Sequence, residues 1–242
     1  MKKVIQHRLS LILVLMAIII FLFAGILYYT NHQEEWAQAK EEKEQQELYA
    51  SLKEENSLEK AKSINPQVIA WLQIPDTTID FPILQCEDNE HYLYYNLENK
   101  ESKLGVPFLD YRCQSDFSDF HSIIYGHHIS QERMFTPLVH FKEKDYFYTH
   151  NYAYLTTSTN QYKIHFIACL LIENDSSLYQ TVFLTNNDKR EFLNNIKNQA
   201  IQKIDFSIDK MIDQKIITLS TCSYEFKNAR TVVIGYLESE EK

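Results

Sequence analysis

The segment IITLSTCSYEFKNARTVVIGYL, residues 216–237, has the pattern of two β-strands joined by a polar turn. Up to Cys222, successive side chains alternate between the two faces of an extended chain, so one face ends in a thiol. Residues 223–229 are typical of a turn, and the β-branched run from Arg230 predicts an antiparallel partner. Opposed residues of such a pair have Cβ atoms about 4.5–5.5 Å apart, so we expect Arg230 beside Cys222. A buried core cysteine followed by a surface arginine fits the same pattern.

A candidate base lies upstream, in the segment HSIIYGHH at residues 121–128. Its short apolar run predicts a strand that ends at one of only four glycines in the chain, and His127 follows directly. A histidine just past a strand end suits the rim of a cleft, where an imidazole can exchange protons near neutral pH. Consecutive residues of an extended chain point to opposite sides, so at most one of His127 and His128 faces Cys222. Cys222, His127 and Arg230 form a candidate catalytic constellation.

Three motifs together resemble the signature elements of the sortases, the membrane-anchored cysteine transpeptidases of Gram-positive bacteria: TLSTC at 218–222, YGH at 125–127 and the strand that begins at Arg230. Three longer segments, INPQVIAWLQIPDTTIDFPILQ, YLYYNLENKESKLGVPFLDYR and IIYGHHISQERMFTPL, resemble class B sortases. The resemblance covers roughly residues 64–237. It implies a mainly β fold with added helices: an eight-stranded sortase-type β-barrel preceded by N-terminal helices and a single transmembrane helix.

The resemblance also implies a role for each candidate residue. Cys222 attacks the Thr carbonyl of a C-terminal sorting signal on a secreted protein and forms a thioester, with His127 as general acid and base. Arg230 stabilises the oxyanion and holds the substrate, which suits a permanently charged fork of donors, and the backbone N–H of Ser223 is a further oxyanion donor. The family motif selects His127 and leaves His128 as a flank. A peptidoglycan amine then resolves the acyl-enzyme. An ion pair between Arg230 and a carboxylate such as Glu225 is the structural alternative.

The segment DKREFLNNIKNQAIQ, residues 188–202, places Phe192, Ile196 and Ala200 on one face and predicts an amphipathic helix. The class B pattern has a helix here, between the sixth and seventh strands of the barrel. We expect this helix to roof the groove beside Cys222 and to favour sorting signals of NPxTx or related PxT type over LPxTG.

Short β-rich runs broken by turn residues predict the rest of the barrel, with no internal repeat. The expected strands are 68–74, 79–84, 104–110, 121–126, 152–157, 161–172, 215–222 and 230–237. Further helices are expected at 88–95 and 131–139.

Residues 9–29 form an almost wholly apolar run, long enough as a helix to cross a hydrocarbon core of roughly 30 Å. Three basic residues precede it, so the positive-inside rule predicts a single-pass membrane protein with a cytoplasmic N-terminus and an extracellular catalytic domain. A cleaved signal peptide is the alternative, although no clear A-x-A site is present.

The polar segment that follows the apolar run is rich in helix formers and predicts a helical spacer. Leu48 and Leu52 share a helical face that could lie against the barrel, whereas a mobile stalk is the alternative for residues 31–45. The predicted domains are a cytoplasmic N-terminus at 1–8, an anchor at 9–29, a spacer at 30–63 and the catalytic barrel at 64–242.

Charge and ligand spacing exclude two classes of function. The formal net charge of −9 argues against a nucleic acid as partner. The sequence has no CxxC or HExxH motif and no acidic cluster suited to Ca²⁺, so we expect no metal and no cofactor. Cys169 lies in an apolar, strand-like run, and a disulfide between Cys86 and Cys113 is an alternative that an extracellular location allows.

Other functions fit parts of the pattern. A cysteine protease of another fold would also use Cys and His, but it usually adds an Asn or Asp to orient the imidazole, and a papain-like chain has its Cys before its His. A pilus-polymerising sortase is a second alternative. A non-catalytic, membrane-tethered barrel that binds a wall component is a third, and it would tolerate loss of the thiol.

Overall fold

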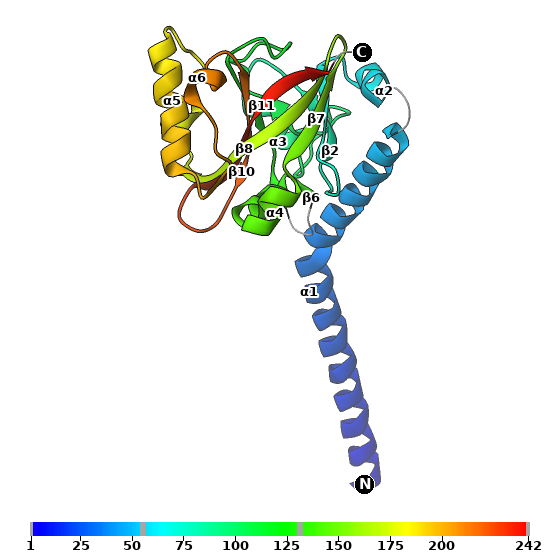
Figure 1. Cartoon of the computed structure of the whole chain (residues 1–242). Coiled ribbons are helices and arrows are strands. Elements are labelled where there is room, and N and C mark those ends of the chain that lie inside the picture. Colours follow the sequence, from blue (N-terminus) through cyan, green and yellow to red (C-terminus); the bar gives the residue numbers. More distant parts are fainter. Residues whose placement is uncertain (1, 54–56, 130–132, 241–242) are drawn as a thin grey trace. The chain divides into compact units, whose positions relative to one another are not determined.

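The computed structural model describes residues 2–53, 57–129 and 133–240. The chain divides into two compact units, Met1–Leu48 and Tyr49–Lys242. Helix α1 (Lys2–Leu52) runs through the first unit, and its last turn belongs to the second (Figure 1). Within α1, Leu13–Gln33 is long and apolar enough to cross a membrane, and its apolar side chains are exposed. This helix is compatible with the single-pass anchor expected near the N-terminus.

Eight strands among the described residues of the second unit close into a β-barrel, as predicted. Neighbouring strands follow the order β11-β10-β4-β3-β2-β1-β7-β8, and the ring closes because β8 also pairs with β11. The short strand β9 extends the sheet beside β8, while β5 and β6 form a separate hairpin. The strands are β1 (Val68–Gln73), β2 (Asp80–Leu84), β3 (Phe108–Leu109), β4 (His121–Tyr125), β5 (His128–Ile129), β6 (Arg133–Met134), β7 (Tyr152–Thr157), β8 (Gln161–Glu173), β9 (Gln202–Lys203), β10 (Lys215–Cys222) and β11 (Ala229–Glu240).

Strand β10 is central to the barrel wall. It pairs with β11 on one side and with β4 on the other, and its residues from Ile216 to Thr221 are all buried. A strand covered on both faces reads as a continuous run of β-branched and small residues rather than a strict alternation, which explains the sequence KIITLSTC. The run ends at Cys222, which is half-buried.

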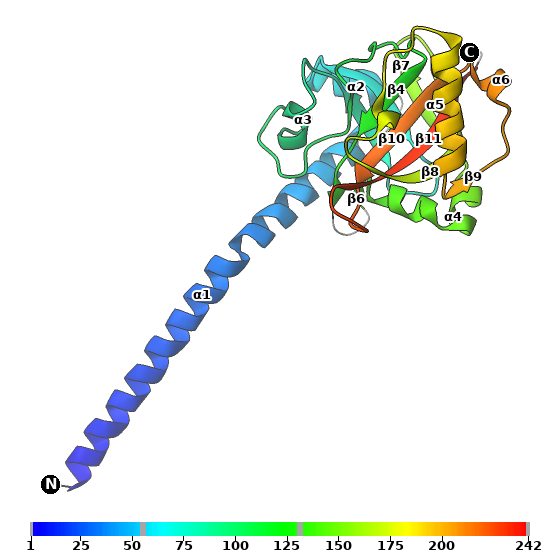
Figure 2. The ribbon, with the colours of Figure 1, turned by 90° about the vertical axis from the view of Figure 1, so that its left-hand side faces the viewer.

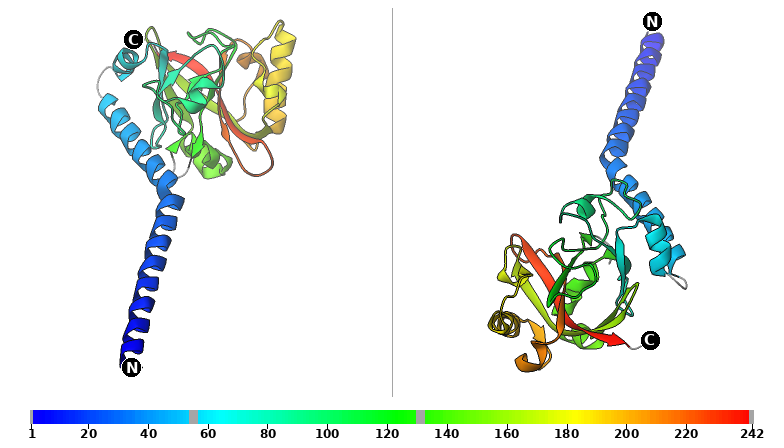
Figure 3. Two further views of the ribbon diagram at one scale, coloured as in Figure 1. Left: turned by 180° about the vertical axis from the view of Figure 1, so that it is seen from behind. Right: turned by 90° about the horizontal axis from the view of Figure 1, so that it is seen from above.

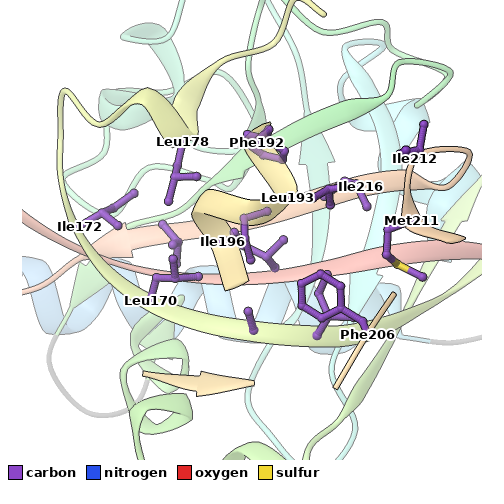
Figure 4. Packing of buried hydrophobic residues seen from close by; sticks show 14 residues of the cluster. Leu170, Ile172, Leu178, Phe192, Leu193, Ile196, Phe206, Met211, Ile212 and Ile216 are labelled. Atoms are coloured by element: carbon purple, nitrogen blue, oxygen red, sulfur yellow. The ribbon is translucent and has the colours of Figure 1, made fainter. Parts of the chain in front are cut away.

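Helix α5 (Asn186–Gln199) covers the outer face of this wall (Figure 2). A capping box starts the helix, since Thr185 Oγ1 accepts a hydrogen bond from the Asp188 N–H and the Asp188 carboxylate accepts one from the Thr185 N–H. Its apolar face packs on β8, β10 and β11 (Figure 4), and the buried residues of this cluster include Leu170, Phe192, Leu193, Ile196, Ile216 and Val232. The helix predicted at 188–202 is therefore present, and Ala200 packs against the same cluster.

The remaining helices are short and lie around the barrel, with α2 and α5 on opposite sides of it (Figure 3). They are α2 (Ser57–Ile64), α3 (His91–Tyr94), the 3-10 helices η1 (Thr136–Lys142) and η2 (Ser177–Tyr179), α4 (Lys144–Thr149) and α6 (Ile208–Met211). The last residue of α1, Leu52, is buried in the second unit, as its amphipathic position predicted.

Three expected elements differ most in extent. The strand expected at 104–110 is reduced to β3, because Gly105 has a φ of +59° and Ser102 Oγ accepts the N–H groups of the two residues before Val106, which bends the chain. The helix expected at 88–95 is limited to α3. Of the helix expected at 131–139, residues 131 and 132 lie outside the described residues, and η1 begins only at Thr136.

Candidate active site

Parallel pairing of β4 and β10 brings the two ends of the predicted constellation together. The ladder runs from Ile216 opposite His121 to Ser220 opposite Tyr125, so both strands end at the same edge of the barrel. Two hydrogen bonds extend the contact: the Gly126 N–H donates to Ser220 O over 3.1 Å, and Thr221 Oγ1 donates to Gly126 O over 2.9 Å. His127, two residues past the end of β4, and Cys222, the last residue of β10, are thereby held on neighbouring segments.

Antiparallel pairing of β10 and β11 places Arg230 directly opposite Cys222, as the sequence predicted. The next pair along the ladder, Ser223 and Ala229, is joined by a main-chain hydrogen bond. The Ser223 N–H donates to Ala229 O over 3.0 Å. Hydrogen-bonded and non-hydrogen-bonded pairs alternate along an antiparallel ladder, so Cys222 and Arg230 form a non-hydrogen-bonded pair, the type with the closest side chains. Both side chains are half-buried.

The side chains of Cys222, His127 and Arg230 line one groove with a volume of about 710 Å³. Its other lining residues come from the region of α3, from β3 and Arg112, from the ends of β4 and β10, and from the connection between β8 and α5. The sequence did not identify these residues as part of a site. They include Asn89, Leu93, Phe108, Tyr125, Asn174, Asp175, Ser176, Ser177, Tyr179 and Gln180.

The groove is not lined by helix α5, contrary to the expectation that this helix roofs it. The apolar face of α5 is buried against the barrel wall, which holds the helix on the outer side of β10. The connection that precedes α5, residues 174–180, forms the wall of the groove instead. An amphipathic pattern indicates which helix face is buried but does not indicate the surface that receives it.

His127 is held by a hydrogen bond of 2.9 Å between Nε2 and Leu93 O. A carbonyl oxygen only accepts, so Nε2 carries the proton and Nδ1 is the ring nitrogen left to take up a proton. Gly105 allows this placement of the ring, because a Cβ at that position would lie 3.1 Å from Cδ2 of His127 and 2.4 Å from Tyr92 O. The tautomer suits a general base.

An ion pair between the exposed Arg112 and the buried Asp110 supports one side of the groove. Arg112 donates from Nε and Nη2 to the two carboxylate oxygens of Asp110 over 2.9 and 2.7 Å, and Tyr125 OH donates to the same carboxylate over 2.9 Å. Burial alone would raise the pKa of Asp110, but the bonds from Arg112 and Tyr125 outweigh it and hold that pKa below its ordinary value. The guanidinium also donates to Tyr179 O over 3.2 Å, which ties the 174–180 connection to the barrel. The spacing of Asp110 and Arg112 in LDYR was the only signal of this pair in the sequence.

Tyr179 lines the groove beside this ion pair, and its ring lies 5.9 Å from that of Tyr125, centroid to centroid. Its hydroxyl shares a 2.8 Å hydrogen bond with Ser220 Oγ, two residues before Cys222. Burial raises the pKa of Tyr179 to about 12, so the phenol remains protonated. The hydroxyl is therefore a neutral polar group within the groove.

The two groups expected to donate to an oxyanion, the Arg230 side chain and the Ser223 N–H, both donate to one carbonyl oxygen in this structure. Arg230 Nη1 donates to Ala229 O over 3.0 Å, and the Ser223 N–H donates to the same oxygen. The alternative pairing of Arg230 with Glu225 is not formed, because Glu225 pairs with Lys142 and accepts a bond from Ser223 Oγ. The fork of Arg230 remains on the groove side.

All four cysteines are free thiols, so the alternative disulfide between Cys86 and Cys113 is not formed. Cys113 and Cys169 are buried, and burial raises the pKa of both thiols to about 12. Cys222 alone among the four lines the groove. Among the described residues, no group of three or more His, Cys, Asp or Glu side chains is arranged to hold a metal ion.

Comparisons with known proteins identify similar chains. A family model described as the sortase domain matches residues 72–238. The curated protein Sortase B of Listeria monocytogenes is 33% identical over 185 residues, which cover 75% of this chain and 74% of that protein. The crystal structure of Clostridium perfringens sortase B is 29% identical, with a TM-score of 0.70 over 74% of this chain and 98% of that one. A Streptococcus pyogenes class B sortase involved in pilus biogenesis is 34% identical, with a TM-score of 0.67 over 74% of this chain and 97% of that one.

Proposed function

Because the chain belongs to the sortase family, and within it to the class B cysteine transpeptidases, we propose that it cleaves a C-terminal sorting signal after its Thr and transfers the protein to a peptidoglycan amine. The observation that carries this proposal is the convergence of Cys222, His127 and Arg230 on one groove. Three residues from three separate segments meet there, and each has the chemistry that acyl transfer needs.

In the proposed acylation step, the sulfur of Cys222 attacks the carbonyl carbon of the Thr. A tetrahedral intermediate forms, and its collapse breaks the C–N bond and leaves a thioester. His127 takes up the proton of the Cys222 thiol and delivers it to the departing amine. In the second step the incoming amine attacks the thioester and gives a proton to His127, Cys222 leaves as the thiolate, and His127 returns the proton to it. The tautomer of His127, with Nδ1 available to carry a proton, supports this exchange.

Arg230 is the proposed main oxyanion donor. A guanidinium presents five N–H groups, and the bond from Nη1 to Ala229 O uses one of them. The backbone N–H of Ser223, predicted as a further donor, is bonded to Ala229 O. Its participation requires that this bond opens when the substrate binds.

The groove wall formed by residues 174–180 is the proposed determinant of specificity. It lines the groove together with Cys222, and its lining residues include Ser176, Ser177 and Tyr179. We propose that this wall accepts signals of the NPxTx or related PxT type in preference to LPxTG. A pocket that differs by one or two contacts discriminates by about 1–3 kcal/mol, or roughly 10- to 200-fold.

The proposed setting of the reaction is the outer face of the cell membrane. The apolar stretch in α1 serves as the single-pass anchor, with a cytoplasmic N-terminus, and residues 64–242 form the catalytic domain that meets secreted proteins. The predicted boundaries at residues 9, 30 and 64 belong to this proposal. The exposed apolar side chains of Leu13–Gln33 support a lipid environment for that stretch.

Pilus assembly is a second candidate. The similar S. pyogenes class B sortase is involved in pilus biogenesis. The two candidates share the acyl-enzyme and differ in the acceptor, which is a peptidoglycan amine for wall anchoring and the lysine of another pilin subunit for polymerisation.

The test uses the full chain in detergent micelles, an NPQTN peptide and an LPETG peptide. We expect mass spectrometry to find a thioester on Cys222 with the first peptide, and kcat/KM at least about tenfold higher for it than for the second. Cys222→Ala should form no adduct, and Arg230→Lys should be strongly impaired because the charge stays while the fork is lost. Transfer to a peptidoglycan stem peptide rather than a pilin lysine peptide would favour wall anchoring. A folded chain that forms no thioester with either peptide would instead support the wall-binding alternative.

A further inference from the structure

The carbonyl group of Cys222 accepts a hydrogen bond from the side chain of His128. The distance from His128 Nδ1 to Cys222 O is 2.8 Å, and both residues are half-buried. We propose that His128 is a positioning residue, which fixes the peptide of Cys222 and thereby the thiol relative to His127. The inference deepens the proposed function and rests on Cys222 as the nucleophile.

Among the residues that the structure describes, no strand pairs with Cys222 on the side of β4. The ladder between β4 and β10 ends at the pair of Tyr125 and Ser220, and the bond from the Gly126 N–H to Ser220 O is the last between their main chains. Beyond this point the chain turns into the hairpin of β5 and β6. Cys222 lies past the end of the ladder, and the imidazole of His128 supplies the donor that a neighbouring strand would otherwise provide.

The peptide between Cys222 and Ser223 is consequently held at both ends. In a trans peptide the C=O and the N–H point in opposite directions. The C=O accepts from His128, while the N–H donates to Ala229 O over 3.0 Å on the other side. Rotation of this peptide would break both bonds, so the direction of the Cys222 side chain is fixed by two independent contacts.

The bond also couples the nucleophile to the base. His127 and His128 are consecutive, and His127 lines the groove while His128 contacts the main chain of Cys222. A shift of Cys222 therefore pulls on the segment that carries His127. Misplacement of reacting groups by about 1 Å can reduce a rate by roughly 100-fold, so this connection has a large effect on turnover.

The contact is suited to positioning rather than to proton transfer. A carbonyl oxygen only accepts, so Nδ1 of His128 carries its proton whether the ring is neutral or charged. The ring of Tyr224 lies 5.0 Å from the imidazole, centroid to centroid, and covers it from the side of the β10–β11 turn.

The test compares His128→Asn with His128→Leu in the full chain. The two substitutes have nearly the same shape, but only Asn has a side-chain N–H close to the position of Nδ1. We expect His128→Leu to reduce kcat by roughly 10- to 100-fold with KM changed less than about threefold, and His128→Asn to restore kcat to within about threefold of the wild type. Equal activity of all three chains would overturn the inference, and so would an Asn variant as impaired as the Leu variant.

His150→Leu is the matched control. His150 Nδ1 also bonds to a main-chain carbonyl, that of Tyr146 over 3.1 Å, but it is not among the groove residues. We expect this variant to keep wild-type kcat. A loss equal to that of His128→Leu would show that any broken histidine contact disturbs the barrel, and the specific role of His128 would be wrong.

A second readout needs no peptide substrate. Iodoacetamide modifies Cys222 in a Cys86→Ser background, where the two remaining thiols are buried. We expect alkylation to be at least about fivefold slower in His128→Leu than in wild type or His128→Asn, because the displaced thiol no longer faces the groove. Absence of an acyl-enzyme in the wild type would contradict the proposed function alone. Identical alkylation rates in the three chains would contradict the positioning role alone.

Discussion

Strand β4 begins with one histidine and is followed, two residues after its end, by another, and the two occupy opposite environments. His121 is fully buried; its Nδ1 donates to Gln180 O over 2.7 Å and its Nε2 accepts from Thr218 Oγ1 over 2.8 Å. His127 lies in the groove with one nitrogen bonded to Leu93 O. The two environments differ because the start of β4, at His121, is covered by α5, whereas its other end opens on the groove.

Burial accounts for the chemistry of His121. It lowers the pKa of this imidazole to about 4, although the bond to Gln180 O acts in the opposite direction. The rings of Phe183 and Phe192 lie 6.3 and 4.7 Å from it, centroid to centroid. A histidine in this setting is a neutral structural group that connects the 174–180 connection with β10. The comparison shows that the surroundings of an imidazole determine its role.

The largest effect is expected at the open end of the strand. His127→Ala should reduce kcat/KM by at least about 1000-fold, because the acid and base of both steps are lost. The melting temperature should stay near that of the wild type, since the side chain lies in a groove. Peptide cleavage and thermal unfolding measure the two quantities. A decrease in kcat/KM of tenfold or less would show that His127 is not the acid and base. The proposed difference in role between His127 and His121 would then be wrong.

The second prediction concerns His121, at the buried end of β4, and the change of the free energy of unfolding with pH. Between pH 6.5 and about 4 the unfolded chain binds a proton at His121 that the folded chain does not, so the free energy of unfolding falls as pH decreases through this window. The expected loss from this residue is about 3 kcal/mol and levels off below the lower pH. His121→Gln keeps one donor and one acceptor but does not titrate. Urea unfolding from pH 7 to 4 should show a steeper decline in the wild type; parallel declines would contradict the prediction.

The smallest effect is expected at the partner of His121. Thr218→Val removes the hydroxyl that donates to Nε2 and leaves a buried acceptor unpaired, at a cost of about 1–2 kcal/mol in the free energy of unfolding. A double-mutant cycle with His121→Phe isolates the interaction, because the double variant no longer has the unpaired acceptor. Additive changes in this cycle would mean that the two side chains contribute independently.

Local patterns predicted much of the fold. The alternation in residues 216–222 and the turn after it predicted the hairpin, and the register of Cys222 with Arg230 is as expected. The catalytic roles of these residues remain predictions. The parallel pairing of β4 with β10 was not predicted, because it depends on closure of the whole barrel and not on either segment alone.

The walls of the groove were equally inaccessible to sequence reasoning. Tyr179 lies in a connection with no periodic pattern, and the pairing of Arg112 with the buried Asp110 becomes visible only when the chain is folded around it. The family motif left His128 as a flank, and its partner, a main-chain carbonyl 94 residues away in sequence, gave no signal of its role. Side-chain contacts with distant main-chain groups leave no periodic signal.

That sequence separation has a consequence for how the chain folds. The hairpin of β10 and β11 is local, so Cys222 and Arg230 can meet early. The contacts that bring the segment of His127 to them span 94 and 95 residues, and pairing over such distances is entropically costly and slow. A partly folded chain therefore carries the proposed nucleophile before the proposed base is in place. During refolding, recovery of activity should be the last signal to appear, after helix and hairpin formation, so the reactive centre arises only in a chain whose barrel is complete.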